Sequence, residues 1–559
     1  MKKLILIPLL LFSLILSGAT YYVAPSGGSD GNAGTNIAAP WATWQKAFTT
    51  ATAGDTVYFR AGVWYPTAQV YKASGNGTRT NPICFFNYPG EVPILDGINK
   101  TSESHGIYLT GVDNIHLKGL TIRNNRQITG EQVQGFLIAN CTNITFTNCT
   151  SHNNGYRGFN LFQTDTAYFY NCDSYRNSDT LSSGPGNGGD GFNFWGYDGN
   201  TASYVIVRGC RAWENSDDGF DTNYDGYVEY DSCWSFNNGN LLSASEGQGF
   251  KLGLKENDAA FLTRRVSNCI MAFNANTGLT TNEDPNDASF VAQSMQIYNN
   301  TSYHNGYHSN HTTWGWGYSI VNSAASSDEI ELSRIFRNNI AYDNAQNPVL
   351  LWPDALYTHS SNTWDIPLTI TDADFVSVDS TGITAARQAN GSLPNNDCYN
   401  YFLRLSSTSD CIDAGTDVGL DYTGIAPDLG WAEYAEQDPP EEPILATLST
   451  YDPYWTSTTT ASTGGFVSDD GGGTVSVRGV CWNTTGTPDT GDSKTEDGTG
   501  DGAFTSTMTG LTQGTTYYVR AYATNEAGTA YGTQMTFRAQ IIKHDNKFIK
   551  HGGKFIIIN

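Results

Sequence analysis

The sequence predicts an all-β protein in which a right-handed parallel β-helix, a solenoid of stacked coils, is followed by a small β-sandwich. The chain has 559 residues, more than one ordinary hydrophobic core encloses, and repeat folds escape that limit. No long stretch has helical periodicity, and short alternating runs such as Asn143–Thr147 lie between turn residues instead. A short repeat marks the middle of the chain and is absent from the last part, which predicts two different β folds in series.

The repeat is a cysteine or asparagine followed five residues later by an asparagine. Its copies are Cys149/Asn154, Cys172/Asn177, Cys210/Asn215, Cys233/Asn238, Cys269/Asn274, Asn300/Asn305 and Asn339/Asn344. The intervals between copies run from 23 to 39 residues, as expected for a short coil that carries insertions. Periods in this range are typical of solenoids, and stacking the coils buries apolar residues that one coil alone leaves exposed.

The two repeated residue types have different expected roles. We expect the asparagines to form a ladder that hydrogen-bonds along the stack and adopts the left-handed backbone. The cysteines of the repeat are expected to be small buried fillers. Cys398 and Cys411 lie outside the repeat and are the better candidates for a disulfide.

Changes in composition predict the domain boundaries. Residues 1–19 have the pattern of a secretory signal peptide, because Lys2 and Lys3 precede an apolar run that ends in small residues. Residues 20–432 are expected to form the β-helix with an N-terminal cap, and residues 433–443 an acidic, proline-rich linker. Residues 444–540 are expected to form the sandwich, in which Thr509–Asn525 resembles the closing strands of a fibronectin type III domain. Residues 541–559 form a tail without an assigned role.

Charge and hydropathy limit the partners. The formal net charge of −25 argues against nucleic acid and anionic membranes, which an acidic surface repels. After the signal peptide no apolar run is long enough to span a membrane, so we expect a secreted protein. We also expect it to be a monomer. An acidic substrate would need a local cation to hold it.

The predicted chemistry lies where the repeat is interrupted. A Gly-Phe or Gly-Leu pair follows each cysteine, nine residues on in three coils, but 19 and 16 residues on at Gly191 and Gly249. Ten and seven inserted residues therefore precede these two glycines, and loops on a rigid scaffold commonly carry function. Aligning the pairs predicts one outward column, with about 4.8 Å between neighbours. Its members are Asn160, Asn193, Asp221, Lys251 and Thr280.

Four carboxylates are expected within two coils of this column, from Asp190, Asp217, Asp218 and Asp221. Crowded carboxylates repel one another unless a cation is bound, and an oxygen-rich set suits Ca²⁺. Judged alone, Asp217–Gly219 is equally well an ordinary solvated turn. The stacking with Asp190 and the neighbouring lysine favour the metal site.

Lys251 is the candidate base. A lone outward lysine is ordinarily solvated, but a calcium ion nearby disfavours its charged form and allows it to accept a proton. Removing the C5 proton of a uronate needs such a base together with a cation at the carboxylate, and elimination of the O4 substituent follows. A calcium ion would also bridge an acidic protein and an acidic polymer.

These segments resemble a known family. Gly189–Asn193, Ser216–Asp221 and Gly249–Gly253 are similar to the catalytic motifs of the family 9 polysaccharide lyases, which are pectate lyases with a β-helix, and the likeness covers roughly residues 20–435. The resemblance implies that the four aspartates bind calcium and that Lys251 is the base. It implies an acidic plant cell-wall polysaccharide as substrate, either pectate or rhamnogalacturonan.

Two further readings stay open. A β-helix glycosidase would use two carboxylates and would not need Lys251. A non-catalytic glycan-binding or adhesin β-helix would use calcium only for folding.

Overall fold

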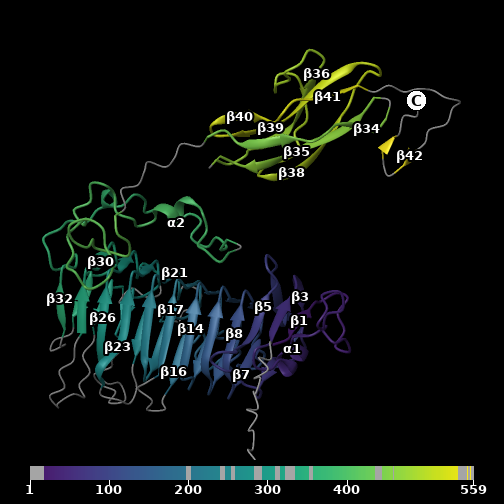
Figure 1. The fold of residues 1–559 in the computed structure, drawn as a ribbon. Coiled ribbons are helices and arrows are strands. Elements are labelled where there is room, and N and C mark those ends of the chain that lie inside the picture. Colours follow the sequence, from purple (N-terminus) through teal and green to yellow (C-terminus); the bar gives the residue numbers. More distant parts are fainter. Residues whose placement is uncertain are drawn as a thin grey trace, which may run out of the picture. The chain divides into compact units, whose positions relative to one another are not determined.

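The computed structural model consists of two compact units, Met1–Ala435 and Glu436–Asn559 (Figure 1). It describes residues 18–196, 203–239, 246–253, 259–281, 293–308, 315–320, 334–351, 357–388, 390–434, 444–457, 459–471, 473–538, 550–551 and 554–555. The predicted signal peptide, linker and C-terminal tail lie largely outside these residues. The proposed domain boundaries therefore stay predictions.

Three parallel sheets wind around the first unit, and each coil gives one strand to each sheet, so that strands of successive coils lie side by side (Figure 1). The first sheet contains β1 (Thr20–Val23), β2 (Thr56–Phe59), β5 (Ile83–Asn87), β8 (Asp113–Lys118), β11 (Thr142–Thr147), β14 (Thr166–Tyr170), β17 (Tyr204–Arg208), β20 (Tyr227–Asp231), β23 (Ala259–Ser267), β26 (Gln293–Tyr298), β29 (Arg334–Arg337) and β32 (Thr358–Ser360). The second, called the site sheet below, contains β4 (Val70–Lys72), β7 (Ile107–Thr110), β10 (Phe136–Ala139), β13 (Phe159–Phe162), β16 (Phe192–Gly196), β19 (Phe220–Tyr224), β22 (Phe250–Gly253), β25 (Leu279–Thr280), β28 (Tyr318–Ile320) and β31 (Val349–Leu351). The third contains β3 (Gly62–Trp64), β6 (Pro93–Asp96), β9 (Thr121–Arg123), β12 (Thr150–His152), β15 (Asp173–Tyr175), β18 (Arg211–Trp213), β21 (Trp234–Phe236), β24 (Ile270–Ala272), β27 (Thr301–Tyr303) and β30 (Ile340–Tyr342). The predicted parallel β-helix is confirmed.

Like residues stack on like inside the helix. In the site sheet, Phe136, Phe159, Phe192, Phe220 and Phe250 form one inward column with ring centroids 4.6–5.0 Å apart. Their backbones are hydrogen-bonded in register, and each ring is at most 1% exposed. The aromatic stack fixes which residue of each strand points inward, and so sends the residue after each phenylalanine to the outer face.

The asparagine ladder forms along the interior of the turns. Each ladder Nδ2 donates to the Oδ1 of the next ladder asparagine at 2.8–3.0 Å, from Asn125 through Asn344. Asn125, which lacks a cysteine five residues before it, is a first member that the spacing does not reveal. The expected left-handed backbone is wrong for the ladder itself: it falls one residue earlier, as at Asn153 and Asn237. That preceding residue turns the chain, which leaves the ladder side chain free to point along the stack.

Loss of one ladder member should destabilise the helix. Asn215→Ala removes the acceptor of the Asn177 side chain and the donor to Asn238, all of them buried. We expect the free energy of unfolding to fall by about 1–3 kcal/mol, the cost of a buried polar group left unpaired. Urea denaturation measures this change, with Asn400→Ala on the exposed surface as the control. Equal stability of the two variants would contradict a structural role for the ladder.

All ten cysteines are free thiols in the structure. Those of the repeat are buried between the sheets, as predicted. The disulfide expected between Cys398 and Cys411 is not formed, and both thiols lie instead in the hydrophobic cluster that covers the third sheet. Burial raises the pKa of each of these two thiols to about 12, which keeps them protonated.

The N-terminal end of the β-helix and the outer face of its third sheet are covered. Helix α1 (Trp44–Thr50) packs its buried Trp44, Ala47 and Phe48 onto the first coils, and η1 (Gly97–Asn99) contacts β9. The segment 366–434, with η2 (Asp372–Asp374) and α2 (Asp397–Tyr401), packs onto the outer face of the third sheet. Its attachment includes Asp173, whose carboxylate accepts from both Arg211 and Arg387. This segment does not cover the outer face of the site sheet.

The second unit is antiparallel. One sheet contains β33 (Thr447–Thr450), β34 (Tyr454–Trp455), β35 (Ala461–Asp469) and β38 (Gly502–Met508). The other contains β36 (Val477–Asn483), β37 (Ser493–Lys494), β39 (Thr516–Asn525), β40 (Gly528–Tyr531) and β41 (Met535–Arg538), and β42 (Lys550–His551) pairs with β43 (Lys554–Phe555). Residues of both sheets share one core. This arrangement agrees with the expected all-β second part, while the fibronectin type III assignment stays a prediction.

Candidate active site

The outward column predicted from the repeat is present on the site sheet. Asn160 pairs in register with Asn193, Asn193 with Asp221, Asp221 with Lys251 and Lys251 with Thr280. Each follows an inward-facing residue of its strand, so the column runs along the outer face. Lys251 and Asp221 are therefore direct neighbours on adjacent strands.

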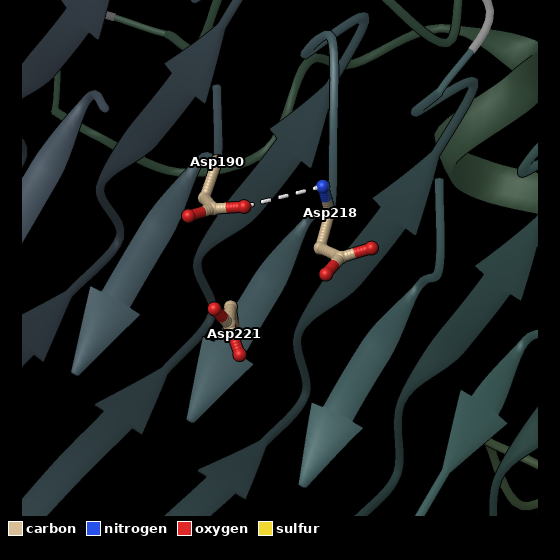
Figure 2. A group of neighbouring side chains, drawn as sticks. All are labelled: Asp190, Asp218 and Asp221. Carbon is tan, nitrogen blue, oxygen red and sulfur yellow. Dashed lines mark hydrogen bonds between the residues drawn. The ribbon is translucent and has the colours of Figure 1, made fainter. Parts of the chain in front are cut away.

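Three buried carboxylates converge beside this column. Asp190, Asp218 and Asp221 each offer an oxygen within 4.8 Å of the others, and none is more than 7% exposed. Figure 2 shows the three side chains turned toward one another, with the backbone N–H of Asp218 donating to Oδ1 of Asp190 at 3.4 Å. Asp190 and Asp218 each precede the glycine that comes directly before β16 and β19, and Asp221 lies on β19 itself.

Asp217 lies next to this group and links the two inserted loops. Its Oδ2 accepts from the backbone N–H of Gly188 at 2.6 Å, and its Oδ1 accepts from that of Glu246 at 2.8 Å. Gly188 belongs to the first insertion and Glu246 to the second. Asp217 is therefore placed to hold both loops over the column, and it is not among the three carboxylates grouped within 4.8 Å.

The Lys251 side chain reaches into the carboxylate group. Its Nζ lies 3.4 Å from Oδ2 of Asp218 and 2.6 Å from Oε2 of Glu246, and the side chain is 14% exposed. The repeat analysis did not reveal Glu246, which stands in the seven-residue insertion and whose contact with Lys251 depends on how that loop folds. Its acidic character, five residues before the candidate base, was the available signal.

Burial and mutual repulsion shift the protonation of these groups. Burial, reinforced by the charge of Asp190, raises the pKa of Asp217 to about 8 and that of Asp221 to about 6. Burial, with repulsion from Asp217, raises the pKa of Asp218 well above its ordinary value. Burial lowers the pKa of Lys251, but attraction to Asp218, Asp221 and Glu246 outweighs it and raises the pKa overall. Without a cation, Asp217 and Asp218 therefore retain protons at neutral pH that ordinary carboxylates would lose.

The donor set fits a calcium ion. It consists of oxygen atoms only, from carboxylates that repel one another in a buried site. Oδ1 of Asn193 is a buried acceptor without a hydrogen-bond partner among the described residues, although the Asn193 amide nitrogen bonds Asp221 at 2.9 Å. Oδ2 of Asp218 accepts no hydrogen bond there and has the Lys251 Nζ ion pair at 3.4 Å. Buried acceptors left unpaired beside clustered carboxylates are what a bound cation satisfies.

Calcium should stabilise the protein more at high pH than at low pH. When folded without metal, Asp217 and Asp221 keep their protons up to about pH 8 and pH 6, whereas their ordinary pKa is 3.8. The folded state then binds more protons than the unfolded state, so these groups lower stability as pH rises from about 4 to 8. A bound cation replaces the protons, and we expect the calcium-induced rise in Tm to be larger at pH 8 than at pH 5. Thermal unfolding with calcium or chelator tests this; a rise independent of pH would contradict it.

A pocket of about 570 Å³ opens at the column. Lys251, Asp221 and Asp217 line one part, and Arg157 and Trp195 line another. Residues of the loop that carries the first insertion also line the pocket. Gln127 anchors this loop, because its side chain donates to Asp179 and accepts from the backbone N–H of Thr180. Arg157 and Trp195 were not predicted from the sequence, since the spacing of the repeat says nothing about turns that bend back over the sheet.

Among the residues that the structure describes, no helix is long and apolar enough to cross a membrane.

Comparison with known proteins identifies the family of this chain. Residues 21–339 match the family model described as Pel9A-like, right handed beta helix region. Pectate lyase L of Dickeya dadantii (strain 3937) is 30% identical over 438 residues, covering 73% of this chain and 89% of that protein. Pectate lyase PEL9 of Emericella nidulans is 28% identical over 415 residues, covering 68% of this chain and 92% of that protein.

Two solved structures share the architecture. The crystal structure of pectate lyase Pel9A superimposes with a TM-score of 0.58 at 26% identity, covering 75% of this chain and 97% of that one. A rhamnogalacturonan lyase also has a TM-score of 0.58 and 26% identity, covering 70% and 97%. The family match spans more than half of the chain, and the fold is that of these lyases. The chain belongs to the Pel9A-like right-handed β-helix family and is a polysaccharide lyase.

Proposed function

We propose that this protein is a secreted, calcium-dependent pectate lyase that cleaves polygalacturonate by β-elimination, with Lys251 as the base. The observation that carries the proposal is the position of Lys251, paired in register with Asp221 and 3.4 Å from Asp218. A lysine among clustered carboxylates suits proton abstraction from an acidic sugar bound through a cation. The relatives named pectate lyase support the substrate class.

The proposed roles divide the site into two parts. Asp190, Asp218 and Asp221 would hold the calcium ion, with Asp217 as the fourth ligand. Calcium bound there would neutralise the uronate carboxylate and favour the charge that develops when C5 loses its proton. Lys251 Nζ takes that proton, the C4–O bond breaks, a C4–C5 double bond forms, and the departing oxygen takes a proton from water. Burial of the cluster under both inserted loops limits access of bulk water.

The protonation of Lys251 controls the reaction. With its carboxylate neighbours uncompensated, the pKa of Lys251 is raised and the amine is charged. A cation on Asp218 and Asp221 would remove much of this attraction and leave Glu246 as the remaining partner, 2.6 Å away. Glu246 is thus placed to set the pH at which the base becomes neutral.

Glu246→Gln should move the pH profile of activity to lower pH. The charge of Glu246 raises the pKa of Lys251, so its removal lowers that pKa and makes the free amine available in more acidic solution. The rate of unsaturated product formation against pH measures the shift at saturating calcium. Glu214→Gln, on the third-sheet side away from the pocket, is the control. A shift to higher pH would contradict the assigned base.

A rhamnogalacturonan lyase using the same site is the second candidate, supported by the structure of that name with the same TM-score as pectate lyase Pel9A. Absorbance of the unsaturated product on each polymer, with calcium or with a chelator, separates the two. Product from polygalacturonate supports the first proposal, and product from rhamnogalacturonan alone supports the second. No product from either polymer with calcium present overturns both.

Secretion is proposed from the N-terminal segment, Lys2 and Lys3 followed by an apolar run and small residues. The acidic polymer of a plant cell wall would then be met outside the producing cell. We also propose that the protein acts as a monomer.

A further inference from the structure

Arg157 is a fixed cation that lines the same pocket as Lys251 and binds Asp190, one of the three grouped carboxylates. It is 7% exposed, and its Nε donates to Oδ2 of Asp190 at 2.9 Å. A guanidinium has five N–H donors. Among the described residues, no hydrogen bond reaches the two terminal NH₂ groups of Arg157, which lines the pocket. The side chain is therefore anchored at one donor and has others left for a ligand.

Aromatic rings hold this guanidinium in place. Its central carbon lies 4.6 Å from the centroid of Tyr156 and 6.0 Å from that of Trp195. Such contacts stabilise the cation and restrict its rotation. A planar, preorganised guanidinium suits a carboxylate, which it can bind through two parallel hydrogen bonds.

An aromatic platform lies beside it. Phe162 pairs in register with Trp195 on adjacent strands of the site sheet, and each lies two residues beyond a member of the outward column, so both face outward. Phe162 is 40% exposed, and both rings line the pocket. Exposed rings in a polar groove suit the apolar face of a sugar.

The platform is distinct from the place where Lys251 lies. Phe162 is on β13 and Lys251 on β22, and the register counts three strand spacings between them, roughly 14 Å. Among the residues lining the pocket, Arg157 and Lys251 are the cationic ones. Arg157 is therefore the pocket's cationic side chain other than the proposed base, and it is available to an anionic polymer.

We propose that Arg157, Trp195 and Phe162 form a separate subsite that binds a uronate residue of the polymer, with the guanidinium on its carboxylate and the rings against its apolar face. This inference rests on the proposed function, because the proposed substrate, polygalacturonate, consists of uronate residues. It makes Arg157 a determinant of substrate binding. The alternative is that Arg157 acts only through Asp190, as a counter-ion that positions a calcium ligand.

Kinetics and calcium binding of Arg157→Gln separate these roles. For a subsite, KM on polygalacturonate rises about tenfold or more, as expected for a lost charged hydrogen bond. The kcat stays within about threefold of wild type. The calcium affinity measured without substrate is retained or increased, because a positive charge 2.9 Å from Asp190 is lost. Phe162→Ala should also raise KM with kcat retained, and Arg157→Lys should restore only part of the binding. Weakened calcium binding with unchanged KM at saturating calcium overturns the proposal.

Matched controls and a binding assay keep the test independent of catalysis. Arg208→Gln, with its side chain 53% exposed, and Phe466→Ala, 43% exposed in the second unit, should leave KM unchanged. Calorimetric binding of saturated oligogalacturonate to Lys251→Ala, with and without Arg157→Gln, measures the subsite where no product forms. If wild type makes no product from polygalacturonate, the pectate proposal fails. Loss of oligogalacturonate binding on adding Arg157→Gln still supports the subsite, and undiminished binding overturns it.

Discussion

Lys251→Ala should lower kcat on polygalacturonate by about a hundredfold to ten-thousandfold, the usual contribution of a general base. Lys251 is paired with Asp221 on the neighbouring strand. Among the residues that line the pocket it is the only lysine, so the substitution removes the pocket's only side-chain amine. Calcium affinity should be retained or increased, because a positive charge 3.4 Å from Asp218 is lost. Initial rates of the rise in ultraviolet absorbance measure kcat, and calorimetry measures calcium binding.

Two further variants make this result specific. Lys118→Ala removes an exposed lysine of β8 and should leave kcat unchanged. Lys251→Arg keeps the charge but not a readily neutralised amine, and should remain as impaired as the alanine variant. Full production of the absorbing unsaturated product by Lys251→Ala would rule out this base and require another group to take the C5 proton.

Asp218→Asn should abolish calcium-dependent activity and weaken calcium binding at least about a hundredfold, since it removes a charged oxygen from the centre of the carboxylate group. The same change should make the protein more stable in chelator. The Asp218 carboxylate is fully buried, and burial with repulsion from Asp217 raises its pKa, so replacing it by a neutral amide relieves an unfavourable interaction.

The sign of the change in Tm in chelator distinguishes a metal ligand from a residue that only stabilises the fold. In chelator, Tm should rise for Asp218→Asn, whereas the calcium-induced increase in Tm should be lost. Thermal unfolding with and without calcium measures both, and Asp421→Asn, on the exposed surface, should change neither. A fall in Tm in chelator together with normal calcium binding would show that Asp218 serves the fold alone.

Much of this site could be predicted because a solenoid turns sequence spacing into spatial distance. Asn160, Asn193, Asp221 and Lys251 occupy the same position of successive coils, and strand pairing puts such residues side by side. The offset of the Gly-Phe pairs also located both insertions. Hydrophobic stacking fixes the register, because a slip of one residue would expose the whole aromatic column.

The backbone of the turns was harder to predict. Left-handed conformations fall on residues as different as Arg176, Glu214 and Phe273, directly before ladder asparagines. Those residue types rarely favour that conformation by themselves. The asparagine that follows each of them gains buried hydrogen bonds, so the ladder imposes the turn on its neighbour.

Sequence alone therefore determined the β-helix, the outward column and the neighbours Asp221 and Lys251, because these depend on a repeated register. Only the tertiary structure decided that Glu246 contacts Lys251, that Asp217 joins the two loops and that Arg157 binds Asp190. These contacts join residues of irregular loops and turns. Such segments take their conformation from what they pack against, and no period in the sequence records it.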